Sequence, residues 1–129
     1  MTLVPHSHRD LLDRPLYVHL ATVRPDGAPQ VNPMWCSWDG ELLYFTNTTT
    51  RFKYGNILAN PAIAISVTDP DQPYRYLEVR GLVERIEPDP LGKFFLTLAE
   101  RYGMSLDGPP GDAPDRVVYV MRPTGESHQ

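Results

Sequence analysis

The chain has 129 residues, a length that fits one domain, and we expect residues 1–129 to form a single unit. Hydrophobic residues make up 41% and charged residues 22%, which is the composition of folded rather than disordered proteins. The net charge of −4 argues against nucleic acid as a partner, because proteins that bind it usually carry a basic face. The single cysteine excludes an intramolecular disulfide and a zinc site built from four cysteines.

No apolar run reaches the 18 or more residues of a membrane-spanning helix, so no contact with a membrane is expected. Residues 1–10 are too polar for a signal peptide, and we therefore expect a cytoplasmic protein. The fourteen prolines are about twice the average share. They predict many turns and few long helices.

The pattern along the chain predicts mainly strands. Six are expected, over residues 17–24, 30–38, 41–47, 62–69, 74–86 and 116–121. Helices are expected after a capping box at residues 7–10, over residues 51–59 and over residues 90–102. Residues 122–129 are polar and are expected to be frayed.

Turn chemistry connects the first three strands as hairpins. Pro25–Gly27 combines a proline with a glycine that tolerates positive φ, and Asp39–Gly40 is a strong hairpin signal. Gly81 interrupts the fifth strand, which predicts a bulge or a bend. Successive hairpins give antiparallel pairing, and a six-stranded antiparallel sheet with few helices closes most easily into a small barrel. The predicted fold class is therefore mostly β.

The usual catalytic motifs are absent. The chain has no dinucleotide fingerprint, no P-loop, no H-E-x-x-H and no serine elbow, so no catalytic side chain is identified. Cys36 has no histidine near it in sequence and is interpreted as a small buried apolar residue. His6 and His8 lie near a terminus, and no metal site is expected. His19 alternates with apolar neighbours and is interpreted as a histidine of the core or of an interface.

The segment Tyr44–Lys53 is the most informative one for function. It places four threonine hydroxyls, Arg51 and Lys53 where a strand runs into the start of a helix. Unpaired backbone N–H groups at a helix start favour an anion, and arginine can pair with two phosphate oxygens. The segment is thus a candidate phosphate cradle. A solvated threonine-rich turn with Thr50 as N-cap is the alternative, and the spacing leaves both open.

A second candidate is the segment Val31–Trp38. Pro33 cannot donate a ladder hydrogen bond, which predicts an edge strand or a bulge. Trp35 and Trp38 fall on opposite faces of a regular strand. One of them is then available to cover a planar ligand while the other packs in the core; two core or interface tryptophans are the alternative.

The order of these segments resembles the pyridoxamine 5′-phosphate oxidase-like superfamily, over about residues 11–119. The segments that carry the resemblance are Leu20–Val31, Asp39–Thr46, Arg51–Lys53, Asn56–Leu58, Asn60–Pro61 and Glu78–Glu84. The chain is most similar to the branch that uses coenzyme F-420, an 8-hydroxy-5-deazaflavin. The resemblance implies a split β-barrel of the FMN-binding type that forms a homodimer, with flavin or deazaflavin sites at the dimer interface.

The resemblance also assigns cofactor-binding residues. It puts the cofactor phosphate on Arg51, Lys53, Thr46 and Thr48, and the ring system along Asn32, Pro33, Met34 and Trp35. Pyridoxamine phosphate oxidases carry a C-terminal segment that binds the substrate phosphate, and nothing similar follows here, so vitamin B6 oxidation is not expected. The loop Asp107–Pro114 is expected to form part of the substrate entrance.

The implied activity is that of a reductase that uses reduced F-420 to transfer a hydride to a small organic acceptor. Hydride transfer is the cofactor's chemistry, which suits a chain without a nucleophile or an acid–base pair. Tyr74, Tyr76 and water are candidate proton donors. The alternatives are an FMN-dependent oxidoreductase of the same fold and a non-catalytic carrier of flavin or haem. His19 is the only histidine inside the predicted fold that could ligate haem.

Overall fold

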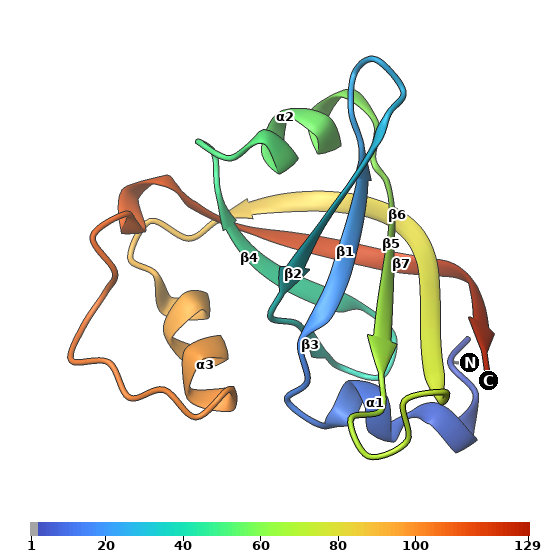
Figure 1. Cartoon of the computed structure of the whole chain (residues 1–129). Helices are drawn as coiled ribbons and strands as arrows, with labels where there is room; N and C mark the ends of the chain where they lie inside the picture. Colours follow the sequence, from blue (N-terminus) through green and yellow to red (C-terminus); the bar gives the residue numbers. More distant parts are fainter. Residues whose placement is uncertain (1–2) are drawn as a thin grey trace.

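The computed structural model describes residues 3–129 as one curled antiparallel sheet with short helices around it (Figure 1). The strands are β1 (Val18–Val23), β2 (Pro29–Met34), β3 (Ser37–Trp38), β4 (Leu43–Thr48), β5 (Ala62–Thr68), β6 (Tyr76–Pro88) and β7 (Arg116–His128). The helices are α1 (Asp10–Asp13), α2 (Phe52–Ala59) and α3 (Lys93–Arg101), with 3-10 turns at His6–His8 and Ala113–Asp115. The expected mostly-β fold class is confirmed.

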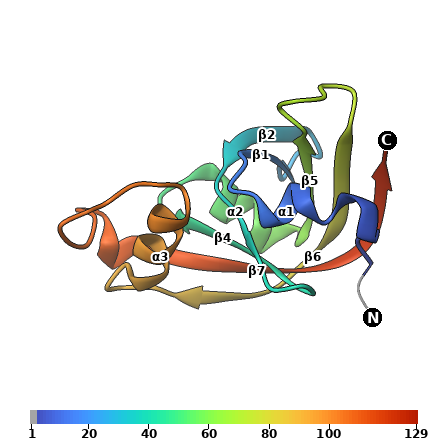
Figure 2. The ribbon, with the colours of Figure 1, turned by 90° about the horizontal axis from the view of Figure 1, so that it is seen from below.

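The sheet is curled because its two edges are consecutive in the chain. The strand order is β2-β1-β5-β6-β7-β4-β3, so β2 and β3 lie at opposite edges. Only Trp35 and Cys36 separate these two strands. The sheet must therefore bend so that the chain can pass from one edge to the other, and Figure 2 shows the curled sheet from below. The prediction of one strand over residues 30–38 was wrong: this bend divides it, and seven strands result instead of six.

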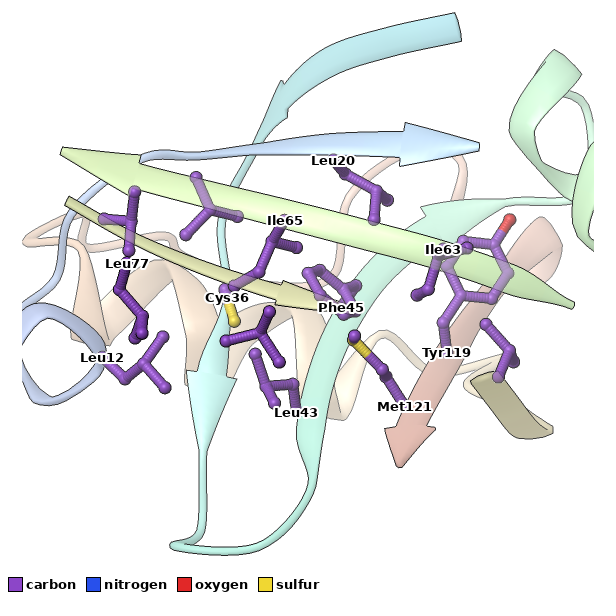
Figure 3. Close-up of a cluster of buried hydrophobic side chains, with 14 of the residues drawn as sticks. Leu12, Leu20, Cys36, Leu43, Phe45, Ile63, Ile65, Leu77, Tyr119 and Met121 are labelled. Atoms are coloured by element: carbon purple, nitrogen blue, oxygen red, sulfur yellow. The ribbon is translucent and has the colours of Figure 1, made fainter. Parts of the chain in front are cut away.

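The hydrophobic core fills the concave side of the sheet (Figure 3). In β5, Ile63, Ile65 and Val67 are buried while their neighbours are not, which is the alternation of a sheet with one covered face. Cys36 is buried in the same cluster, which confirms its interpretation as an apolar residue. His19 is exposed between two buried neighbours of β1, so it is not a core histidine, and its interpretation as an interface histidine stays a prediction.

The C-terminal residues are not frayed, contrary to the prediction. β7 continues to His128 and pairs with β6 along its length, from Pro88↔Val117 to Leu77↔His128. A thirteen-residue β6 supplies the backbone partners that hold the polar tail in the sheet. The predicted irregularity at Gly81 is confirmed, because the register shifts between Arg80 and Gly81.

The N-terminal helix exists, but the predicted capping box does not form. The Ser7 hydroxyl lies 2.8 Å from Nδ1 of His8, and no side chain caps α1. The carbonyl end of α1 is held instead by Arg101 of α3, whose Nη2 donates to the carbonyl oxygens of Leu12 at 2.7 Å and Arg14 at 3.0 Å. This contact fixes α3 to the end of the barrel.

The loop between β5 and β6 is tied to α1 by charges. The guanidinium of Arg75 donates to Asp10 at 2.6 Å and to the buried Asp69 at 2.9 Å. Backbone N–H donation from Asp71 and the bond from Arg75 lower the pKa of Asp69.

Within residues 3–129, no helix is long and apolar enough to span a membrane. The first two residues of the polar segment 1–10 lie outside the described part.

Candidate cofactor site

A cleft of about 390 Å³ opens where β2, the end of β4, the start of α2, α3 and the start of β7 meet. Its lining residues are Tyr17, Asn32, Pro33, Met34, Trp35, Thr46, Asn47, Arg51, Lys53, Phe95 and Arg116. Seven of the eight residues that the resemblance assigned to the cofactor therefore share one cleft. The eighth, Thr48, is buried beside it, with its hydroxyl 2.8 Å from that of Thr50.

Two cations at the start of α2 form one wall of the cleft. Neither Arg51 nor Lys53 has an ion pair with any residue in the range 3–129. Lys53 is half-buried, and its ammonium donates only a long bond of 3.5 Å to Oδ1 of Asn32. Burial, and then the neighbouring charge of Arg51, lower the pKa of Lys53. The wall carries positive charge that no described carboxylate balances.

The start of α2 differs from the alternative interpretation in one respect. Arg51, in extended backbone conformation, occupies the N-cap position, and no side chain caps the helix. The Thr50 hydroxyl bonds to Thr48 instead, so the prediction of Thr50 as N-cap was wrong. The first N–H groups of α2 are thus not satisfied by a threonine cap, and they lie beside the two cations.

The opposite side of the cleft is built from residues 32–35 and aromatic rings. β2 is an edge strand, which confirms the prediction made from Pro33. Trp35 stacks on Tyr102, with ring centroids 5.2 Å apart and planes 13° apart, and lies 5.9 Å from the ring of Phe95. Trp38 packs against the core instead. One tryptophan therefore lines the cleft and the other supports the barrel.

The resemblance did not assign four of the lining residues: Tyr17, Asn47, Phe95 and Arg116. Asn47 lies between two threonines that were assigned, and its side chain bonds to the Tyr119 hydroxyl at 3.5 Å. Phe95 belonged to an apolar helix stripe that is equally typical of a core. Arg116 lies 70 positions from Thr46, whose hydroxyl it contacts at 3.4 Å, and no local pattern connects them.

Two further expectations concern the surroundings of the cleft. Tyr74 and Tyr76 do not line it, and Tyr74 is exposed in the β5–β6 loop beside His8. Tyr17 is the phenol in the lining.

The loop Asp107–Pro114 contributes no lining residue, but its Asp112 holds Arg116 through two hydrogen bonds of 3.0 Å each. No group of three potential metal ligands occurs within residues 3–129.

The donor set of the cleft fits a phosphorylated ligand with a planar ring. Unpaired cations and hydroxyl groups suit phosphate oxygens, and the aromatic wall suits a flat ring system. A family model described as "Pyridoxamine 5'-phosphate oxidase" matches residues 4–128. The chain belongs to this family. A comparison with curated protein sequences finds no match.

Three solved structures share the fold of this chain. A protein described as an F-420 reductase is 65% identical, with a TM-score of 0.95 over 98% of this chain and 100% of that one. The General Stress Protein 26 from Bacillus anthracis str. Sterne is 24% identical, with a TM-score of 0.71 over 93% and 88% of the two chains. HupZ from Group A Streptococcus is 17% identical, with a TM-score of 0.70 over 97% and 93%. The last two show a shared fold only.

Proposed function

We propose that this protein is an oxidoreductase that binds coenzyme F-420 in the cleft and uses its reduced form to transfer a hydride to a small organic acceptor. The single observation that carries the proposal is the pair Arg51 and Lys53, which lie beside a wall of planar rings and have no carboxylate partner among residues 3–129. The 65% identity to a protein described as an F-420 reductase supports deazaflavin as the cofactor.

Each wall of the cleft has a task in this proposal. Arg51 and Lys53 bind the cofactor phosphate, with charge-assisted bonds worth roughly 1.5–3 kcal/mol each. Residues 32–35 line the ring system, and the stack of Trp35 on Tyr102 keeps that wall rigid. The bound deazaflavin supplies the hydride chemistry. The protein supplies position, and alignment of donor and acceptor lowers the barrier by several kcal/mol.

FMN is the second candidate cofactor. Membership of the pyridoxamine 5′-phosphate oxidase family favours it, and the Arg51–Lys53 wall suits the phosphate of either molecule. The two cofactors differ in their reaction with oxygen, which is fast for reduced flavins and slow for deazaflavins. Oxygen consumption by the reduced complex therefore separates them.

The test is a titration of the purified protein with F-420 and, separately, with FMN, following tryptophan fluorescence. Trp35 lines the cleft and Trp38 does not, so Trp35→Phe should remove the quenching while Trp38→Phe should keep it. Tighter binding of F-420, followed by oxidation of its reduced form by an organic acceptor, supports the proposal. Preferential binding of FMN favours the second candidate. Tight binding without turnover of any acceptor favours a carrier, and binding of neither removes the assignment.

We also propose that two copies of the chain form a homodimer. An apolar groove of about 370 Å³ lies over β1, β5 and β6, and its lining includes Ala21, Ala62, Ala64 and Leu82. In this proposal, the second copy covers the groove. Light scattering of the purified protein tests this: a mass of twice 14.6 kDa supports the dimer, and a monomer at micromolar concentration contradicts it.

A further inference from the structure

The cleft holds a third cation, away from Arg51 and Lys53. Arg116 begins β7, and its side chain is 15% exposed. Lys53 reaches toward β2, where it contacts Asn32, whereas Arg116 lies under α3. Figure 1 shows α2 and α3 on either side of the end of β4 and the start of β7. Lys53 therefore enters the cleft on the side of β2, and Arg116 enters it on the side of α3.

Three partners immobilise Arg116. Its guanidinium carbon lies 4.4 Å from the ring centroid of Phe95, the geometry of a cation–π contact. Asp112 accepts one hydrogen bond from Nε and one from Nη2, both at 3.0 Å. Nη1 points to the hydroxyl of Thr46 at 3.4 Å. A guanidinium held on three sides binds a ligand without losing further side-chain entropy.

The donor count of Arg116 leaves room for a ligand. An arginine has five N–H donors. The pair of bonds to Asp112 uses two and the contact with Thr46 uses one, so two remain at a side chain that lines the cleft. The edge that faces Thr46 is the one that Asp112 does not occupy. Asp112 thus acts as a positioning residue that presents this edge to the cleft.

Building on the proposed function, we propose that Arg116 binds a second anionic group of the ligand, apart from the phosphate at Arg51 and Lys53. The cleft then selects ligands with two separated anionic groups over ligands with one. F-420 has both a phosphodiester and carboxylates, whereas FMN has a single phosphate group. Arg116 is in this way a specificity-determining residue, supplied by the strand after the Asp107–Pro114 loop.

The experiment compares Kd values of F-420, FMN and inorganic phosphate for Arg116→Gln and the wild type. We expect the Kd of F-420 to rise about tenfold, as for one lost charge-assisted bond, while those of FMN and phosphate change less than about twofold. Arg122→Gln is the matched control, since Arg122 lies on the same strand outside the cleft and pairs with Glu84. It should leave all three affinities unchanged.

Two additional variants keep the result interpretable. Arg116→Lys retains the charge, so its Kd for F-420 should lie between those of the wild type and Arg116→Gln. This variant tests the role of Arg116 if the glutamine variant does not fold. Equal weakening of F-420 and FMN, or no weakening of either, overturns the proposal. Lys53→Gln should weaken all three ligands. If Lys53→Gln weakens none of them, the proposed phosphate site is wrong. That result differs from a failure of the Arg116 proposal, in which Arg116→Gln leaves the ratio of F-420 affinity to FMN affinity unchanged.

Discussion

The backbone N–H of Cys36 donates a hydrogen bond of 2.9 Å to the phenol oxygen of Tyr102, 66 positions away in the chain. The same phenol donates to the carbonyl oxygen of Leu16 at 2.7 Å. Tyr102 follows α3, and Cys36 lies in the bend between the two edge strands. One side chain therefore joins the bend, the start of β1 and the helix that covers the cleft, and its ring carries Trp35.

Tyr102→Phe should destabilise the fold by about 1–3 kcal/mol, because it leaves the N–H of Cys36 and the carbonyl of Leu16 without this partner. Burial raises the pKa of Tyr102, so the phenol stays protonated at neutral pH and keeps its donor role. Urea unfolding followed by circular dichroism measures the effect. Tyr74→Phe, at a phenol that is 87% exposed, is the control and should change the stability by less than about 0.5 kcal/mol.

The thiol of Cys36 should be unreactive in the folded protein. Burial raises its pKa to about 12, and only the thiolate is nucleophilic. At pH 8, an aromatic disulfide reagent should label it in urea but not in buffer. Labelling at equal rates in both conditions would contradict the buried position.

The raised pKa of Cys36 also predicts that the stability of the folded protein depends on pH. The native thiol keeps its proton up to about pH 12, whereas the unfolded thiol loses it near the ordinary value of 9.0. The unfolded state therefore binds fewer protons, and stability falls as the pH rises above 9.0. Cys36→Ala should show a shallower fall between pH 9 and 11 in urea unfolding, and parallel curves for the two proteins would contradict this.

Gly81→Ala should be strongly destabilising. A Cβ at this bulge would overlap the carbonyl oxygen of Arg122 and lie 2.9 Å from Cε of Met121 in the core. The overlapping atom is backbone and cannot move without disturbing the β6–β7 ladder, so a loss of about 2 kcal/mol or more is expected. Gly108→Ala is the matched control, because no heavy atom lies within 4 Å of its added Cβ. Thermal melts of both variants check the difference.

The affinity for F-420 or FMN should fall as the pH becomes alkaline. The fall should begin at a lower pH than it would with a lysine of ordinary pKa. Burial and then Arg51 lower the pKa of Lys53 in the free protein, while a bound phosphate favours the charged form. As the pH rises through the lowered pKa, binding must take up a proton and becomes weaker. Kd measured from pH 7 to 10 checks this. Lys53→Gln should bind more weakly at pH 7 and lose this pH dependence, and an unchanged slope would remove Lys53 from the site.

The candidate site could be predicted in part from local sequence. The threonine-rich strand end, Arg51 and Lys53 are neighbours in the chain, and the residues around Pro33 and Trp35 form a second continuous segment. The structure brings both segments to one cleft, because β2 and the end of β4 face it from two sides. Arg116 and Phe95 could not be found in this way, since their relation to Thr46 exists only after β7 pairs with β4 and α3 docks.

By itself, the sequence determined the mostly-β class, the turns at Gly27 and Gly40, the bulge at Gly81 and the resemblance to the pyridoxamine 5′-phosphate oxidase family. These depend on local backbone preferences and on alternation along single strands. Only the tertiary structure decided that residues 30–38 break into two edge strands, that the polar tail is part of β7 and that Arg116 enters the cleft. These outcomes depend on which distant strands pair. Contacts between residues that lie far apart in the chain stabilise that pairing, and no local sequence pattern connects those residues.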